Sequence, residues 1–240
     1  FLNRILTFPK WFFAKLKGFT NRTFSYDSSL MYLDKKFATL FFDIKKNNQK
    51  SETIIFITAD HGNAKAHSPK RKNGEKDYFL GMYEESLKIP LLINNTNFQI
   101  QKDCKLIDSM GISTTLLETL NIPLHASFKG ISLYSGGRPT VISEHTGRGL
   151  PDVISGALYF VLTSENDKLF VCMKEKELVL KYYDLLTDSI EENNLIEKKE
   201  YRLRILNLLK YLLKERGDII AHRFEKIKCE KFDFKLEEIV

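Results

Sequence analysis

Asp60, His61 and Gly62 follow one another directly after the apolar run from Thr53 to Thr58. An Asp carboxylate supplies a hard oxygen and a neutral His supplies a ring nitrogen, and both kinds of atom bind divalent metal ions. A glycine lets the backbone turn sharply, so that both side chains can point into one cavity. The tripeptide alone is weak evidence, because Asp is common after strands and His is often only a hydrogen-bond partner. The elements around it must therefore decide whether it marks a metal site.

Two further segments carry side chains suited to binding an anion. Residues 63–78 are polar and basic, and Lys76 and His67 are the catalytic candidates within them. A flexible ammonium can neutralise an anion or its leaving group from several backbone positions. His145 and Arg148 leave a predicted strand as substrate-binding candidates, since a guanidinium suits bidentate contact with a sulfate or carboxylate. The alternatives are a solvated basic loop for the first segment and a polar turn for the second.

The elements around the tripeptide predict an α/β core. Apolar residues at helical spacing indicate a helix over 26–46. Residues 53–58 are apolar on both faces, which is typical of a strand in a parallel sheet between helices. Ligands of such sheets bind at the carboxyl ends of the strands, which is where the tripeptide stands. Downstream, the pattern predicts a buried strand over 87–93 and a helix over 108–119.

The pattern changes near residue 139, where short apolar runs separated by turns predict an antiparallel sheet. A stripe of leucines that includes Leu203 predicts a closing helix over 198–215, ended by Gly217. The expected fold is α/β, a mostly parallel sheet with helices on both faces plus a smaller antiparallel sheet packed on a helix. We expect one domain over 1–138 and a second over 139–240. The predicted strands of the second domain are 140–143, 157–163, 168–173 and 178–185.

Composition sets broad limits on function. The chain has 240 residues and a net charge of +6, which suits an anionic substrate, although a mild excess of Lys spread along a chain usually serves only solubility. We expect no nucleic-acid partner. Its three cysteines are far apart and predict neither a disulfide framework nor a zinc cluster. No apolar stretch reaches the roughly 18 residues of a membrane span. The first residue is Phe1, so we expect the natural amino terminus upstream, and the compartment stays open between periplasm and cytoplasm.

Five segments together resemble the sulfatase family of the alkaline phosphatase superfamily. Residues 53–62 are similar to the family's strand Ile-Ile-hydrophobic-Thr-Ser-Asp-His-Gly, and residues 82–93 to its Tyr-Glu-Glu-Ser-Leu-Arg-Ile-Pro-Leu-Ile. Residues 108–123 look like the helix that leads into its Gly-Ile-Pro, and residues 129–133 like its Gly-x-Ser-Leu. Residues 183–195 resemble its Tyr-Asp-Leu-x-x-Asp-Pro-x-Glu-x-x-Asn-Leu. The segments occur in the family's order and spacing.

The resemblance implies an alkaline-phosphatase-like fold and one divalent cation, usually calcium in this family, with Asp60 and His61 among its ligands. The ion would neutralise sulfate oxygens and orient the nucleophile. The family's other ligands include an Asp-Asp pair, and its nucleophile is a formylglycine made from Cys/Ser-x-Pro-x-Arg. Neither pattern occurs in this sequence, so we expect a carboxyl-terminal part whose nucleophile lies in an upstream segment. A rigid count from Tyr83 places Phe79 where the family has a sulfate-contacting Lys, and Lys76 is the nearest substitute.

The sequence thus predicts a metal-dependent hydrolase of small-molecule or saccharide sulfate esters, inactive as the 240-residue chain alone. Phosphodiesterases, phosphonate monoester hydrolases and phosphoethanolamine transferases share the Asp-His-Gly strand and are alternatives within the superfamily. A non-catalytic binding protein descended from a sulfatase is an alternative of another class. Phe79 favours that alternative, and the intact Asp60 and His61 argue against it. The oligomeric state is not predicted.

Overall fold

The computed structural model describes residues 21–47, 53–63, 81–94, 106–145, 157–174 and 177–224. The chain divides into two compact units, Phe1–Lys70 with Glu85–Asn97, and Arg71–Glu84 with Phe98–Val240. Helices and strands alternate, and a separate antiparallel sheet follows, which confirms the predicted α/β class. The domain boundary predicted after residue 138 stays a prediction. Within the described ranges, none of the helices is both long enough and apolar enough to cross a membrane.

The first unit holds two short strands that pair with each other. Strand β1 (Ile55–Thr58) and strand β2 (Leu91–Asn94) run antiparallel, with Phe56 opposite Ile93. The prediction of parallel neighbours for β1 is therefore wrong for the one pairing that the structure describes, which is antiparallel. The physical reason is that apolar side chains on both faces of a strand indicate burial, and burial does not determine strand direction.

The strand predicted over 87–93 is shorter than expected: its first residue ends helix α4 (Glu84–Leu87), and β2 begins at Leu91. The strand begins only after Pro90. Proline has no amide hydrogen to donate to a sheet ladder, so it is found at the start or edge of strands rather than inside a paired one. Pro90 therefore delimits β2 instead of lying within it.

Helix α2 (Asn21–Asn47) confirms the helix predicted over 26–46 and is somewhat longer. The apolar side chains that recur at helical spacing along α2 are only partly covered in the described structure. Leu30 and Leu33 each expose 47% of their surface, and Leu40 exposes 51%. The first unit therefore presents apolar surface along α2.

The second unit is built around a four-stranded antiparallel sheet with strand order β3-β4-β5-β6. Each strand pairs with the next one in the sequence, as where Phe160 lies opposite Val171, so the sheet is a meander of hairpins. This confirms the antiparallel sheet predicted downstream of residue 139. The strands are β3 (Thr140–His145), β4 (Leu158–Ser164), β5 (Asp167–Lys174) and β6 (Glu177–Asp184).

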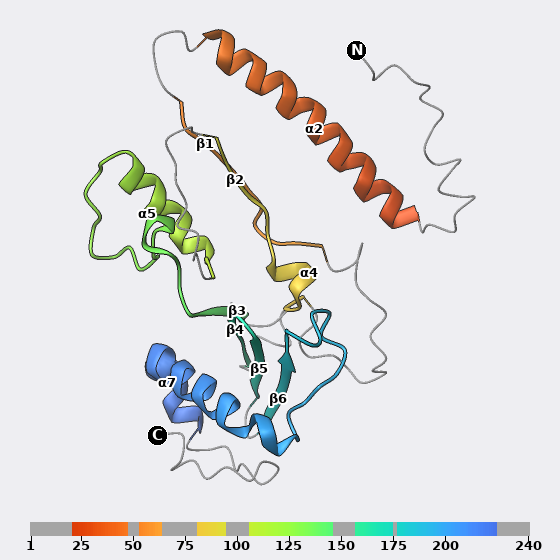
Figure 1. Ribbon diagram of the computed structural model, residues 1–240, viewed down its shortest axis with the longest axis vertical. Helices are drawn as coiled ribbons and strands as arrows, with labels where there is room; N and C mark the ends of the chain where they lie inside the picture. Colours follow the sequence, from red (N-terminus) through yellow and green to blue (C-terminus); the bar gives the residue numbers. More distant parts are fainter. Residues whose placement is uncertain are drawn as a thin grey trace. The chain divides into compact units, whose positions relative to one another are not determined.

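Helix α7 (Arg202–Phe224) covers one face of this sheet, after the short 3-10 helix η2 (Lys199–Tyr201) (Figure 1). Ile205, Leu209 and Leu212 on α7 are fully buried in a cluster with side chains of β4, β5 and β6. Burying one such side chain contributes roughly 1.5–3 kcal/mol. The packing of α7 on the sheet is thus a continuous hydrophobic core, as the sequence predicted.

Two details of α7 differ from the prediction. Leu203, expected on the buried stripe, is 70% exposed. A helix turns about 100° per residue, so Leu203 stands roughly 120° away from the buried Leu209. Gly217 does not end the helix: the backbone leaves helical geometry at Arg216, with φ −136°, and the helix resumes as far as Phe224. The glycine therefore follows a kink.

Helix α5 (Ser109–Thr119) confirms the helix predicted over 108–119, and Asp108 caps it by accepting the Gly111 N–H at 2.9 Å. Such a cap is worth about 1 kcal/mol. The chain returns against α5 very closely, because a Cβ on Gly130 would lie 2.1 Å from the Met110 carbonyl oxygen. The close approach explains why a glycine stands before Ile131, Ser132 and Leu133. Residues 129–133, which resemble the family's Gly-x-Ser-Leu, therefore pack closely against α5.

Candidate functional site

Asp60 and His61 lie directly after β1, where the chain leaves the sheet. Asp60 Oδ1 accepts the backbone N–H of His61 at 2.9 Å, and His61 Nδ1 lies 2.7 Å from the carbonyl oxygen of Gly62. A carbonyl can only accept, so Nδ1 carries the hydrogen in this bond, and a neutral ring keeps its lone pair on Nε2. Nε2 lies 3.6 Å from Asp60 Oδ2. One carboxylate oxygen and one imidazole nitrogen thus converge.

These two atoms fit a divalent cation as part of a ligand set. Oxygen ligands of calcium lie about 2.3–2.6 Å from the ion, and imidazole nitrogens lie about 2.0–2.1 Å from zinc, so two such ligands at right angles would be roughly 3–3.5 Å apart. The side chains of His61 and Asp60 are 76% and 87% exposed, so an ion can reach both. In the described ranges, no three or more His, Cys, Asp or Glu side chains gather in a group that could hold a metal. Two ligands fall short of the six to eight that calcium takes.

Gly62 holds this turn through its backbone. Its N–H donates to the Ser86 carbonyl oxygen of α4 at 2.7 Å. A Cβ at this position would lie 2.1 Å from the Glu85 carbonyl oxygen, so any residue other than glycine would force the backbones apart. On the other side of the candidate ligands, the Thr58 hydroxyl donates to the Pro90 carbonyl oxygen at 2.9 Å. Hydrogen bonds on both sides of the candidate ligands therefore hold the turn to the segment that contains α4 and β2.

His145 is the other predicted site residue that the structure describes. It ends β3, is half-buried, and meets the Tyr159 ring edge-on with centroids 6.0 Å apart. Lys76, His67 and Arg148 lie outside the described residues. The structure thus brings the two predicted metal ligands together, and the catalytic and substrate-binding assignments stay predictions.

A buried charged cluster in the second unit was not predicted from the sequence. The Lys168 side chain on β5 is 0% exposed; its Nζ lies 2.7 Å from Glu84 Oε1 and contacts Glu191 Oε1. Glu191 Oε2 accepts the Glu84 backbone N–H at 3.0 Å. Burial raises the pKa of Glu191, and the nearby Lys168 charge opposes that rise. Both glutamates stand in segments that resemble the sulfatase family, whereas nothing in the sequence distinguishes Lys168 from the other lysines.

The turn that carries Glu191 is folded by its own polar side chains. Asp188 accepts the backbone N–H groups of Glu192 and Asn193 at 3.1 and 2.7 Å. Asp184 likewise accepts a backbone N–H two residues further on, at 3.1 Å. Asp and Asn commonly stabilise turns in this way. The polar residues of segment 183–195 are therefore engaged in shaping the turn.

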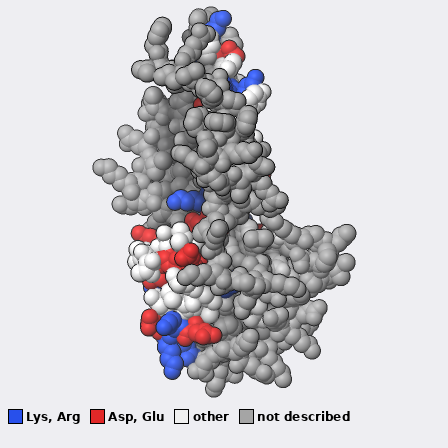
Figure 2. Space-filling view, turned by 90° about the vertical axis from the view of Figure 1, so that its right-hand side faces the viewer, with Lys and Arg blue, Asp and Glu red and all other residues white. Residues whose placement is uncertain are grey.

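A second charged cluster joins α7 to the sheet. Arg204 Nη2 lies 2.5 Å from Asp167 Oδ1, and its Nη1 lies 3.3 Å from Asp184 Oδ2. Tyr182 donates its hydroxyl to Asp167, and burial together with this bond raises the pKa of Tyr182. On the face shown in Figure 2, the described basic side chains are interspersed with acidic ones. Among the described residues on that face, neither basic nor acidic side chains form a surface of their own.

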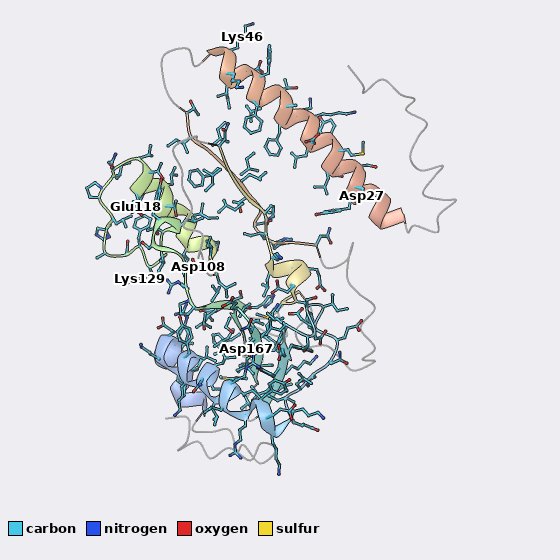
Figure 3. The ribbon with its side chains drawn as sticks, in the orientation of Figure 1. Asp27, Lys46, Asp108, Glu118, Lys129 and Asp167 are labelled. Carbon is cyan, nitrogen blue, oxygen red and sulfur yellow. The ribbon has the colours of Figure 1, made fainter. Side chains whose placement is uncertain are left out.

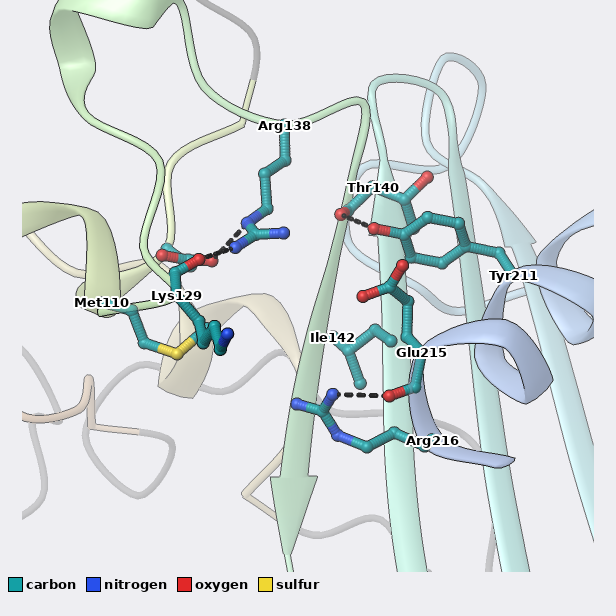
Figure 4. Close-up of a pocket in the computed structure, with 9 residues that line it drawn as sticks. Met110, Lys129, Arg138, Thr140, Ile142, Tyr211, Glu215 and Arg216 are labelled. Carbon is teal, nitrogen blue, oxygen red and sulfur yellow. Dashed lines mark hydrogen bonds and ion pairs between the residues drawn. The ribbon is translucent and has the colours of Figure 1, made fainter. Parts of the chain in front are cut away.

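A cavity of about 440 Å³ lies in the second unit, apart from this cluster (Figure 4). Arg138 Nε lies 2.9 Å from Asp108 Oδ2, and the Tyr211 hydroxyl donates to the Thr140 carbonyl oxygen at 3.2 Å. Asp108 is the N-cap of α5, and Lys129 lies on the loop that returns beside this helix (Figure 3). These guanidinium and phenol groups are engaged within the walls. The cavity is lined by Asp108, Met110, Lys129, Arg138, Thr140, Ile142, Tyr211, Glu215 and Arg216.

Comparison with known proteins points to one family. The family model described as Sulfatase matches residues 9–122. The arylsulfatase of Clostridium perfringens (strain 13 / Type A) is 26% identical over 205 residues, covering 80% of this chain and 39% of that protein. This match extends well beyond the two candidate ligands.

Solved structures share the fold. BT4656 in complex with its substrate D-glucosamine-2-N,6-O-disulfate gives a TM-score of 0.57 at 20% identity, over 79% of this chain and 40% of that one. The phosphonate monoester hydrolase of Agrobacterium radiobacter gives 0.58 at 20% identity, over 77% and 39%. At these identities the likeness shows the fold alone. The chain spans 39–40% of the length of these relatives.

Proposed function

We propose that the protein hydrolyses sulfate esters with the help of a divalent cation, because residues 9–122 match the sulfatase family model and the chain is similar to an arylsulfatase. We assign Asp60 and His61 as two ligands of that ion, with calcium, the family's usual metal, as the cation. The observation that carries the proposal is the convergence of His61 Nε2 and Asp60 Oδ2, 3.6 Å apart, just beyond the end of β1.

Each ligand has a defined part. The backbone N–H of His61 donates to Asp60 Oδ1 at 2.9 Å, which orients the carboxylate. The other oxygen of this exposed side chain, Oδ2, supplies a charged ligand atom. The Gly62 carbonyl oxygen holds His61 Nδ1–H, so that Nε2 presents its lone pair. When bound, a divalent cation would neutralise sulfate oxygens and orient the attacking group. We place the remaining ligands and the formylglycine nucleophile in a further segment, because their motifs do not occur in this sequence.

The substrate class that we propose is a saccharide sulfate ester. It rests on the structural relative that was solved with a disulfated glucosamine as its substrate. Lys76 and His67 would contact the sulfate or the leaving group, and Arg148 and His145 the rest of the substrate. Cationic side chains suit these roles, because a sulfate ester is an anion whose leaving group develops negative charge.

Metal binding by the chain tests the ligand assignment. Terbium luminescence and calcium competition give the affinity of the wild type, Asp60→Ala and His61→Ala. We expect at least a tenfold loss of affinity in each variant, with an unchanged far-ultraviolet circular dichroism spectrum. Asp27→Ala is the matched control, because Asp27 is an exposed carboxylate of α2 in the same unit. Wild-type affinity in Asp60→Ala would show that the ion binds elsewhere.

Activity is measured on the longest natural polypeptide that contains these residues, with aryl and saccharide sulfates. We expect Asp60→Ala to lower kcat/KM at least 100-fold, and the 240-residue chain alone to show no turnover. If the 240-residue chain turned over substrate as fast as the longer polypeptide, our placement of the nucleophile would be contradicted.

A second candidate function is hydrolysis of phosphonate monoesters. The observation that favours it is the fold match to the Agrobacterium radiobacter hydrolase, with a TM-score of 0.58. The ratio of kcat/KM for an aryl sulfate to that for an aryl phosphonate separates the two. A ratio above one supports the sulfatase, and a ratio well below one supports the phosphonate hydrolase.

A further inference from the structure

The segment from Met82 to Glu84 packs against the four-stranded sheet. Met82 and Tyr83 are 3% and 2% exposed. The Tyr83 ring meets the Phe170 ring with centroids 4.9 Å apart, and Lys181 Nζ donates to the Tyr83 hydroxyl at 3.2 Å. These contacts fix the chain immediately before α4 begins.

Glu84, the first residue of α4, is held at two separate points. Its carboxylate lies 2.7 Å from Lys168 Nζ, and its backbone N–H donates to Glu191 Oε2 at 3.0 Å. Lys168 Nζ also contacts Glu191, so one buried ammonium joins both glutamates. A side-chain bond and a backbone bond together define the position and the direction of the first residue of a helix. Glu84 therefore cannot shift without breaking this cluster.

Stability alone does not account for such a cluster. Taking an ammonium and a carboxylate out of water costs free energy that their attraction often only offsets, and apolar replacements of buried pairs are frequently neutral or stabilising. Glu191 also adopts φ 57°, in the left-handed region that residues other than glycine rarely take. A strained residue and a buried charge are better explained by the position that they impose on Glu84.

Helix α4 continues from Glu84 to Ser86, whose carbonyl oxygen accepts the Gly62 N–H at 2.7 Å. We propose that Lys168 and Glu191 are positioning residues for the Asp60–His61 turn: they fix Glu84 at the start of α4, and α4 fixes Gly62. The inference deepens the proposed function, because it assigns to this cluster the geometry of the proposed metal ligands. It requires no contact between the cluster and the ion.

Hydrogen exchange at the Gly62 amide tests this directly in the full chain. Lys168→Met keeps a long side chain and removes the charge, so that Glu84 loses its buried partner. We expect the Gly62 amide to exchange at least tenfold faster in this variant, and terbium affinity to fall at least fivefold. Exchange at the Leu209 amide, in the core of α7, reports global unfolding in the same sample.

Arg204→Met is the matched control, because it breaks the other charged cluster of the same sheet, with Asp167 and Asp184. We expect this control to leave Gly62 exchange as in the wild type. Glu191→Gln is a second variant for the case in which Lys168→Met does not fold. Its amide oxygen can still accept the Glu84 N–H, so we expect a smaller acceleration at Gly62, of twofold to fivefold.

Unchanged Gly62 exchange in a folded Lys168→Met or Glu191→Gln chain would overturn the inference. Equal acceleration by Arg204→Met would also overturn it, because the effect would then be general loosening. If Gly62 responds as expected while the wild-type chain binds no terbium or calcium, the positioning inference stands and the metal assignment fails. If terbium binds and Gly62 does not respond, the metal assignment stands and the positioning inference fails.

Discussion

The four-stranded sheet and the β1–β2 pair bury their apolar side chains to very different extents. Leu162 and Leu169 of the sheet are 0% exposed and lie in the core beneath α7, whereas Leu92 of β2 is 61% exposed. The candidate ligands follow β1, in the less completely packed region. A turn in such a region depends on a few specific contacts, those of Gly62 and Thr58, rather than on the support of a core.

The largest expected effect separates the two regions by stability. Leu209→Ala removes a fully buried side chain of α7 and should lower the free energy of unfolding by about 2–5 kcal/mol. Leu92→Ala makes the same chemical change on β2 and should alter it by about 0.5 kcal/mol or less. Urea denaturation followed by circular dichroism measures both. Equal losses in the two variants would mean that β2 is packed as tightly as the core.

A glycine pair tests the contacts of the turn. Gly62→Ala would place a Cβ 2.1 Å from the Glu85 carbonyl oxygen, so the backbones must separate. We expect a loss of about 1–3 kcal/mol in unfolding free energy, typical of overpacking, and weaker terbium binding.

Gly217→Ala is the matched control, because a Cβ there meets no atom within 4 Å. Alanine favours a helix by up to about 1 kcal/mol over glycine, so this variant should be neutral or slightly more stable. Destabilisation by Gly217→Ala as large as that by Gly62→Ala would remove the distinction between the two sites.

The smallest expected effect concerns pH and the buried cluster. Burial raises the pKa of Glu191 above its ordinary value of 4.5. Its contribution to stability is therefore fully present below that value and is lost as pH rises through the folded-state pKa. Glu191→Gln does not titrate, so the stability of the wild type relative to this variant should decline as pH rises above about 4.5. Urea denaturation across this range measures the difference, and a relative increase would show a lowered pKa instead.

Much of the fold was predictable, because helix α5, the antiparallel strands and the core of α7 follow local periodicity. The direction of β1 was not, since its apolar pattern reports burial alone. The candidate ligands were found because Asp60, His61 and Gly62 are adjacent in the sequence. Lys168 was missed for the opposite reason: its partners Glu84 and Glu191 come from distant segments, and only the folded chain brings these charges together.

The bond between the Glu84 N–H and the Glu191 carboxylate spans 107 residues, and this separation has a consequence during synthesis. At roughly 5–20 residues per second, Glu191 leaves the ribosome about 5–20 s after Glu84. The hairpins of the sheet are local and can pair as they emerge, but the start of α4 has no fixed place until the turn after β6 exists. The Asp60–His61 turn should therefore be among the last parts of the nascent chain to settle. A ribosome that stalls before β5 and β6 are made would leave Tyr83, which packs against Phe170 and Tyr183, exposed to chaperones and proteases.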